Sequence, residues 1–379
     1  MDFVAVDIGA SNTRYLSIDR HVNFLANNIT FIPDMNAVID LAHLDDVVEN
    51  NLDVSIWKDG ESKDFPARVL IGVLASRYSN GSQRPSQLKS KAEQRINYVS
   101  CVMTVALSKL KDSSIGDKVN MFVALPPTEV LNKKGDIAER LIGKYTVRFN
   151  RIGKEGTTVT FEINKVACYP ESRMALIQYL NDPTHVEERR VKYAGCNIMS
   201  LDIGASTTDI VVFKDGNKYY DKASRTFKIG MNAARDRVAD DVMNLLEMHI
   251  PTDSVEQCMI EGRVKSGNKY KDVGDILNNA KAAVANELVN EMDLYFNKAG
   301  IPLTDINYII VSGGGSMESS YIDANGSVVK TSDPMSVHIT NALSSVCPDV
   351  DVEYFGDEPR LANIKGLGLA AIVKGGEID

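Results

Sequence analysis

The sequence offers few of the residues from which metal centres and disulfide frameworks are built. It has five cysteines and five histidines among 379 residues. The cysteines are scattered, odd in number and without a Cys-x-x-Cys pair, a pattern that argues against a disulfide framework or a structural zinc site. Cys101, Cys168 and Cys196 stand in apolar stretches, so we expect buried thiols in a reducing compartment.

Long apolar runs and an excess of positive charge are also lacking. No stretch approaches the roughly 20 apolar residues that a membrane-spanning helix needs, and the N-terminus resembles a core strand rather than a signal peptide. We therefore expect a cytoplasmic protein without a membrane partner. The formal net charge of −9 argues against broad, direct binding of nucleic acid, which requires a basic surface. Arg189, Arg190 and Lys192 form a basic cluster directly after Glu187 and Glu188, and we interpret it as a solvated charged loop.

The composition is typical of a soluble globular protein with sizeable hydrophobic cores. Hydrophobic residues make up 44% and charged residues 25% of the chain, and its length suits two domains. Strand patterns precede helix patterns in each half, which predicts two related α/β domains with mixed sheets. The expected strands are 3–8, 14–19, 23–32, 53–57, 65–73, 119–125, 145–150, 157–163 and 306–312, and the expected helices are 89–111, 170–180, 232–249, 271–298 and 362–373. Asn232 is the expected N-cap of its helix.

Two segments of the chain are near copies of each other. Residues 3–14 read FVAVDIGASNTR, and residues 199–213 read MSLDIGASTTDIVVF. Each predicts a strand, a tight turn of small residues and a second strand. Such a turn lets backbone N–H groups approach a phosphate, and the leading Asp fits if hydrated Mg²⁺ lies between carboxylate and phosphate. Two such hairpins, with Asp7 and Asp202, would clamp a nucleotide. The alternative is a duplicated hairpin in which Asp merely favours the turn.

Five segments in order resemble the signature segments of the actin, sugar kinase and heat-shock chaperone superfamily. They are the two DIGAS hairpins, ACYPESRMA (167–175), VSGGGS (311–316) and NIKGLGLAA (363–371). Within the superfamily, three details resemble the ParM-like actins of bacteria, which segregate plasmids: Tyr-Pro-Glu-Ser, the segment ALPPTEVL (124–131) and Asp209. The resemblance implies the actin-like fold, with mixed sheets flanked by helices around a nucleotide cleft. The implied domains are 1–180 with 350–379, and 181–349.

The resemblance also implies roles for individual residues. Asp7 and Asp202 would hold Mg²⁺ through its waters. The catalytic residues would be Asp202, through that ion, and Glu171, which would polarise the attacking water. The alternative for Glu171 is a carboxylate that stabilises the start of a helix after Pro170. The residues implied in binding ATP, with GTP left open, are Gly9, Ala10, Ser11, Asn12, Arg14, Gly204, Ala205, Ser206, Thr207, Asp209, Gly313, Gly314, Gly315 and Ser316. For the three glycines the alternative is a plain turn after a strand.

The implied function is a filament-forming ATPase that assembles with ATP, segregates plasmid DNA and reaches DNA through a separate DNA-binding adaptor. A small-molecule kinase of the same superfamily is the alternative. It would need a catalytic Asp at an acceptor hydroxyl, and residues 70–130 contain no such motif that we recognise. A non-polymerising scaffold or chaperone fragment is a third possibility. Residues 34–64 are hard to match to the superfamily, in which this region often makes filament or partner contacts. Residues 181–196 are longer than in compact relatives.

Overall fold

The structure is a computed structural model and describes most of the chain. The described residues are 2–9, 12–32, 39, 49, 51–60, 68–78, 83–86, 89–152, 156–216, 218–247, 249–356 and 358–378. Two compact units are present: unit 1 comprises residues 1–174 and 363–379, and unit 2 comprises residues 175–362. The divisions thus fall inside one helix (171–180) and at the start of another (362–373). Most of residues 34–64 lie outside the described residues.

Within the described part of unit 1, nine strands form one mixed sheet in the order β3-β2-β1-β7-β9-β8-β5-β6-β4. They are β1 (Asp2–Ile8), β2 (Asn12–Leu16), β3 (Asn23–Ala26), β4 (Ile29–Ile32), β5 (Asn51–Lys58), β6 (Arg68–Gly72), β7 (Lys118–Leu125), β8 (Gly143–Phe149) and β9 (Thr157–Pro170). Strands β1, β7 and β9 pair in parallel, and the other neighbours pair antiparallel. The central position of β1 and β7 explains their continuous apolar runs, because both faces are covered.

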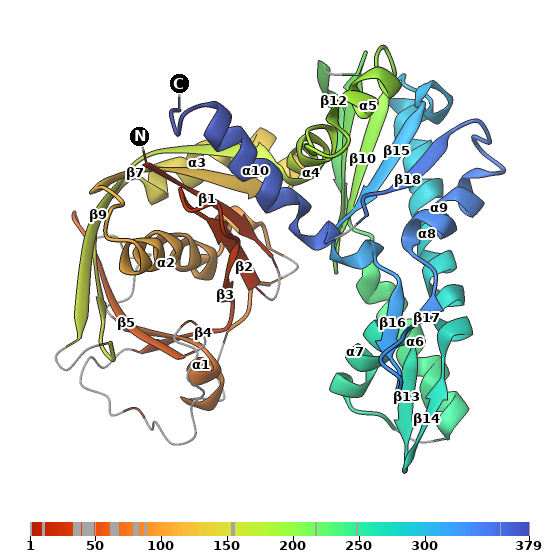
Figure 1. The fold of residues 1–379 in the computed structure, drawn as a ribbon, viewed down its shortest axis with the longest axis horizontal. Helices are drawn as coiled ribbons and strands as arrows, with labels where there is room; N and C mark the ends of the chain where they lie inside the picture. The colour runs from red at the N-terminus through yellow and green to blue at the C-terminus, as the bar shows by residue number, and fades with distance from the viewer. Residues whose placement is uncertain are drawn as a thin grey trace. The chain divides into compact units, whose positions relative to one another are not determined.

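The sheet of unit 1 curls around helix α2 (Arg95–Lys111), as Figure 1 shows. Strands β3 and β4 lie at opposite edges of the sheet, yet only Asn27 and Asn28 separate them in sequence. Two residues cannot span a flat sheet of this width, so the two edges must approach each other. Every residue of α2 from Ile96 to Ser108 is buried as a result. A helix enclosed in this way needs no polar face.

Two helices complete the layers of unit 1 beside the short α1 (Val73–Tyr78). Helix α3 (Pro127–Leu141) starts at a proline in its first turn, where the missing N–H costs nothing. Helix α10 (Ala362–Val373) agrees with the predicted bounds. The Pro126-Pro127 pair predicted the end of a strand, and helix α3, which starts there, was not predicted.

Unit 2 contains a smaller mixed sheet that repeats five strands of the larger one. Its described strands follow the order β12-β11-β10-β15-β18. They are β10 (Ile198–Ile203), β11 (Thr208–Lys214), β12 (Lys218–Phe227), β15 (Tyr308–Ser312) and β18 (Asp351–Tyr354). Parallel pairs join β10 to β15 and β15 to β18, and antiparallel pairs join β10 to β11 and β11 to β12. The order β3-β2-β1-β7-β9 in unit 1 has the same pairing pattern, which confirms two related α/β domains.

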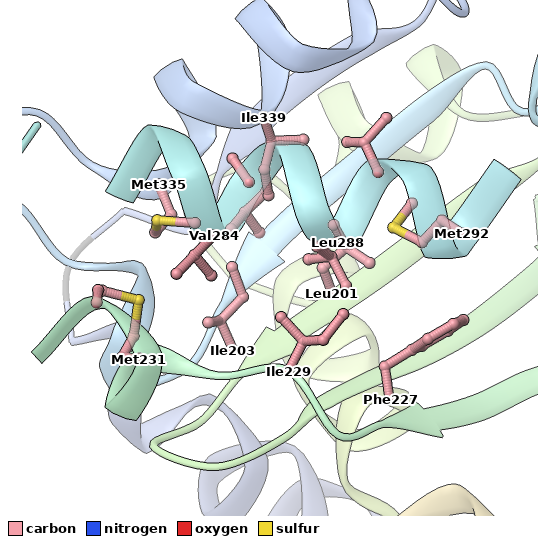
Figure 2. Close-up of a cluster of buried hydrophobic side chains, with 14 of the residues drawn as sticks. Leu201, Ile203, Phe227, Ile229, Met231, Val284, Leu288, Met292, Met335 and Ile339 are labelled. Atoms are coloured by element: carbon pink, nitrogen blue, oxygen red, sulfur yellow. The ribbon is translucent and has the colours of Figure 1, made fainter. Parts of the chain in front are cut away.

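The core of unit 2 lies between this sheet and its helices. The helices are α6 (Met231–Leu246), α7 (Thr252–Glu261), α8 (Gly274–Lys298) and α9 (Met335–Leu343). Figure 2 shows Val284 and Leu288 of α8 beside Leu201 and Ile203 of β10, with Ile339 of α9 on the other side of α8. Two small hairpins complete the unit: β13 (Arg263–Ser266) with β14 (Lys269–Asp272), and β16 (Ser319–Ile322) with β17 (Val328–Ser332).

Several predicted elements differ from the structure. The expected strand 23–32 is two strands at opposite edges, because Asn27 and Asn28 break it. The N-cap of α6 is Gly230 rather than Asn232. The stretch at 269–272 pairs as β14, so α8 begins only at Gly274. Residues 351–354 form β18 in the sheet of unit 2, whereas the predicted domain limit of 350 would assign them to the first domain. We attribute this difference to a strand too short to show a pattern.

The basic cluster lies on a short helix rather than in a loop. Helix α5 (Val186–Lys192) has exposed residues on most of its surface. Arg189 pairs with Asp182, Arg190 pairs with Glu187, and Lys192 pairs with Glu353. These pairings neutralise much of the positive charge that the sequence displays. Among the described residues, no helix is both long and apolar enough to cross a membrane.

Candidate active site

The first hairpin loop of unit 1 is closed by the residues that the sequence singled out. The amide of Gly9 donates to the carbonyl of Asn12 at 3.1 Å. A Cβ on Gly9 would lie 2.7 Å from that same oxygen, so a side chain at this position would push the turn open. Ala10 and Ser11 at the tip lie outside the described residues.

Asp7 and Arg14 form an ion pair across the two strands of this hairpin. They occupy paired positions in β1 and β2, and Nη1 of Arg14 lies 2.9 Å from Oδ2 of Asp7. Asp7 is 2% exposed, and Nε of Arg14 is buried without a hydrogen-bond partner among the described residues. The guanidinium thus compensates the charge of the buried carboxylate, and one N–H group of Arg14 stays unused.

Asn27, which the sequence reading missed, holds the first loop from behind. Its Nδ2 donates to the Gly9 carbonyl at 2.6 Å, and its Oδ1 accepts from Thr13 at 2.7 Å and from Ser100 at 3.2 Å. Asn27 is fully buried and follows directly after β3. The amide therefore connects the loop, β2 and α2. The only sequence signal was a polar pair, Asn27-Asn28, inside an apolar stretch.

Glu171 lies where β9 runs directly into helix α4 (Glu171–Leu180). Its side chain is buried, and Nζ of Lys91 donates to its Oε1. Lys91 belongs to a short 3-10 helix, Lys91–Glu93, that precedes α2. The sequence predicted Glu171 but offered no sign of Lys91, since 80 residues separate the pair.

The second hairpin loop, in unit 2, repeats the first. The amide of Gly204 donates to the carbonyl of Thr207 at 2.8 Å, as Gly9 does to Asn12. A Cβ on Gly204 would lie 3.1 Å from that oxygen. The two copies thus share one backbone hydrogen bond and one reason for glycine. The amides of both glycines donate inside the turns, and their part in binding a phosphate stays a prediction.

The carboxylates of the second hairpin face each other without a basic residue at the paired position. Asp202 and Asp209 are directly opposite in β10 and β11, and a carboxylate oxygen of one lies within 4.8 Å of a carboxylate oxygen of the other. They are 7% and 3% exposed. Two buried like charges at this distance repel each other strongly unless a cation or a proton compensates them.

The start of α6 supports the second loop. The amide of Asn232 donates to the Ala205 carbonyl at 2.7 Å, and its Nδ2 donates to Oγ of Ser206 at 3.1 Å. The amide of Met231 donates to the Gly204 carbonyl at 3.1 Å. Asn232 is therefore a loop anchor in the first turn of the helix, and not its cap.

The segment Gly313–Ser316 follows β15 and lies beside Asp202. Gly313 has φ +92°, and a Cβ there would lie 2.2 Å from Oδ1 of Asp202. The amide of Gly313 donates to the Pro359 carbonyl at 3.2 Å, and Oγ of Ser316 donates to the Gly313 carbonyl at 2.8 Å. Glycine is thus required beside the carboxylate, beyond what a plain turn demands.

The structure brings the predicted residues into one neighbourhood within each unit. In unit 1 these are Gly9, Asn12, Arg14 and Asp7. Glu171 belongs to the same unit and lies at the start of α4, directly after β9. In unit 2, Asp202, Asp209, the loop 204–207 and the segment 313–316 meet at the ends of β10, β11 and β15. Their roles toward a nucleotide stay predictions.

Comparisons with known proteins agree with this architecture. Residues 200–320 match the family described as "Archaeal actin homologue MreB-like, C-terminal". Solved structures match along nearly the whole chain. The chain has the actin-like fold.

Three of these solved structures illustrate the sequence identity, coverage and TM-score of the matches. ParM of Bacillus thuringiensis with ATP is 16% identical, covers 99% of both chains and gives a TM-score of 0.63. A 15-stranded ParM filament from Clostridium botulinum is 18% identical over 97% of both chains, with a TM-score of 0.64. The actin-like protein Alp7A is 17% identical, covers 98% of this chain and 96% of its own, and has a TM-score of 0.69. No curated protein sequence matches significantly. The resemblance to ParM-like actins is confirmed at the level of fold.

Proposed function

We propose that this actin-like chain is an ATPase that assembles into filaments with ATP and disassembles after hydrolysis. The observation that carries the proposal is the loop built twice, each time after a buried aspartate, with the same glycine hydrogen bond. Loops of this kind offer backbone N–H groups to phosphate oxygens. Because Gly9 and Gly204 use their amides inside the turns, the role falls to the amides that follow them. Related folds have been solved with ATP and with AMPPNP, and one as a filament.

The residues of unit 2 fit a divalent cation. Asp202 and Asp209 place two buried carboxylates opposite each other, and a Mg²⁺ ion with its waters would neutralise them. Bound Mg²⁺ supplies positive charge to the phosphates of a nucleotide. Asp202 would orient its waters, and Asp209 would share the charge. Asp7 is already paired with Arg14, so its part in metal binding would be more distant.

The residues of unit 1 fit the anionic end of a nucleotide. The buried Nε–H of Arg14 has no partner among the described residues, and a phosphate oxygen would satisfy it. Arg14 would then balance the charges of both Asp7 and the phosphate. Glu171 would orient the attacking water as a carboxylate acceptor. Gly313–Ser316 would let the nucleoside lie against the backbone, and this leaves both ATP and GTP possible.

The proposed cellular role, plasmid segregation, depends on the proposed filaments. Filaments that grow and shrink with nucleotide would move plasmid DNA in the cytoplasm, and each unit would contribute one phosphate loop. The chain is acidic, with net charge −9, so we propose that a separate basic adaptor protein connects it to DNA. In the proposed domain assignment, the C-terminal helix α10 belongs to the first domain together with the N-terminal part of the chain.

Calorimetry and sedimentation test the proposal together. Titration of Mg-ATP should show binding to the wild type. Asp202→Ala should weaken it by about 2–3 kcal/mol because a buried charged contact is lost. The matched control is Asp221→Ala, since Asp221 is exposed on β12 and should bind normally.

Ultracentrifugation should pellet the wild type with ATP and leave it in solution with ADP or without nucleotide. Unchanged Mg-ATP affinity in both Asp7→Ala and Asp202→Ala would refute the site. Binding without sedimentation, accompanied by phosphorylation of a sugar or small acid, would favour the kinase alternative.

A further inference from the structure

The Lys91–Glu171 ion pair is built with more support than an ordinary surface pair. Nζ of Lys91 contacts Oε1 of Glu171, and the two side chains are 24% and 9% exposed. Burying such a pair brings little net stability, because the loss of hydration offsets much of the attraction. Stability alone therefore does not account for the contact.

Glu129 holds the backbone of the turn that carries Lys91. Its carboxylate accepts from the amide of Lys91 at 2.8 Å, from the amide of Ala92 at 3.0 Å and from Oγ of Ser90 at 2.8 Å. Bonds from N–H groups to a charged carboxylate are among the stronger ones in proteins. Glu129 lies in the first turn of α3, within the segment ALPPTEVL.

Asn97 holds the same turn from the other side. Its Nδ2 donates to the Lys91 carbonyl at 2.9 Å, and Asn97 is buried in α2. The peptide groups on both sides of Lys91 are thus fixed by side chains from two helices. A lysine has a long, flexible side chain, and fixing its backbone reduces the region that its ammonium group samples.

We propose that Lys91 is a positioning residue for nucleotide hydrolysis, acting through Glu171, and that Glu129 fixes Lys91 for this task. This inference rests on the proposed function. The ammonium group anchors one carboxylate oxygen and limits the rotamers of the glutamate. A carboxylate held in one orientation presents its acceptor to water without a further loss of entropy. The pair thereby links α3, through the Lys91 turn, to the start of α4.

Hydrolysis kinetics of the full chain test the proposal. Lys91→Met should lower kcat by at least about tenfold, while the Kd for Mg-ATP should stay within about twofold because the proposal gives Lys91 no contact with the nucleotide. Lys91→Arg should recover part of the rate, since it keeps the positive charge. The matched control, Lys89→Met, removes an exposed lysine two residues away and should behave as the wild type.

Glu129→Gln provides a second route to the same prediction. It keeps the shape of the side chain, but it removes the charge and replaces one of the two acceptor oxygens with an NH2 donor. The turn should therefore loosen without losing every bond, so kcat should fall less than in Lys91→Met. Thermal unfolding of each variant shows whether it is folded. If Lys91→Met does not fold, Lys91→Arg and Glu129→Gln carry the test, and wild-type rates in both would overturn the proposal.

A double-mutant cycle separates positioning from a structural role. If Lys91 acts through Glu171, then Lys91→Met should cause no further loss in a Glu171→Ala background. An equal loss in both backgrounds would overturn the proposal. Wild-type hydrolysis by Glu171→Ala would refute the role of the glutamate and this inference with it. Slow hydrolysis by Glu171→Ala, together with a wild-type rate in Lys91→Met, would refute the inference alone.

Discussion

At the scale of residues, the two copies of the hairpin differ in charge although they share a backbone. The aspartate of the first copy faces Arg14, and the aspartate of the second faces Asp209. The first pair joins opposite charges, whereas the second brings two carboxylates together. The duplicated loop therefore has one position at which a basic side chain faces the aspartate and one at which two carboxylates could share a cation.

Asn27 holds the first loop through its buried side-chain amide. In Asn27→Ala, the Gly9 carbonyl and the hydroxyls of Thr13 and Ser100 would lose their partner. We expect a loss of about 2–4 kcal/mol in the free energy of unfolding. Urea titration measures it. Asn23→Ala is the control, because the side-chain hydrogen bonds that the structure describes for Asn23 lie at the exposed surface. An equal loss there would contradict the role of Asn27.

At the scale of elements, Gly313, which follows β15, could be required for one of two reasons. Either a side chain there would collide with its neighbours, or its backbone conformation favours glycine. Gly313 and Gly326 both have positive φ, +92° and +82°. A Cβ on Gly313 would meet Asp202 at 2.2 Å, whereas a Cβ on Gly326 would meet nothing within 4 Å. We expect Gly326→Ala to cost about 1 kcal/mol and Gly313→Ala at least about 3 kcal/mol. Similar losses in thermal or urea unfolding would show that conformation alone decides.

Lys281 couples α8 to the β16–β17 hairpin and predicts a pH dependence. Its buried Nζ donates to Ser332 at 2.8 Å and to the carbonyls of Met317 and Asp333 at 3.0 and 2.8 Å. Burial lowers the pKa of Lys281 to about 8, against the opposing charges of Asp333 and Glu318.

The unfolded chain keeps the ordinary lysine pKa of 10.5 and so binds more protons between these two values. Stability attributable to Lys281 should therefore rise from about pH 8 to pH 10.5 and level off above it, by up to about 3 kcal/mol. Subtracting the unfolding curve of Lys281→Met isolates this contribution from other groups that titrate there. A difference that is flat across this range would contradict the prediction.

At the scale of the whole molecule, the repeated strand order shows that the two units resemble each other beyond the two DIGAS hairpins. Five strands of each unit share their order and their parallel or antiparallel pairing. Unit 1 then adds β8, β5, β6 and β4 and encloses α2. One topology thus supports two sheets of different size.

The charge of the whole chain predicts its behaviour toward DNA. With net charge −9, and with the basic residues of α5 paired to carboxylates, the protein alone should not bind DNA at physiological salt. A mobility-shift assay over a range of protein concentrations measures this. Tight, sequence-specific binding by the chain alone would contradict the adaptor proposal and would direct attention to Arg189, Arg190 and Lys192.

The sequence by itself determined the features that depend on near neighbours. The hairpins around Gly9 and Gly204, the buried strands β1 and β10 and the helix α10 follow from local periodicity and from the steric needs of tight turns. The repeated DIGAS segments also indicated two related domains, because identical local patterns build identical local structures.

Only the tertiary structure decided which distant residues meet. It split the stretch 23–32 between two sheet edges, placed β18 beside β15, and brought Lys91 to Glu171 and Asn27 to Ser100. Such contacts depend on how the whole chain closes its sheets and buries its helices, and no short-range pattern records that. The physical reason is that a hydrogen bond between residues far apart in sequence is selected by packing around both partners, whereas a turn is selected by its own backbone.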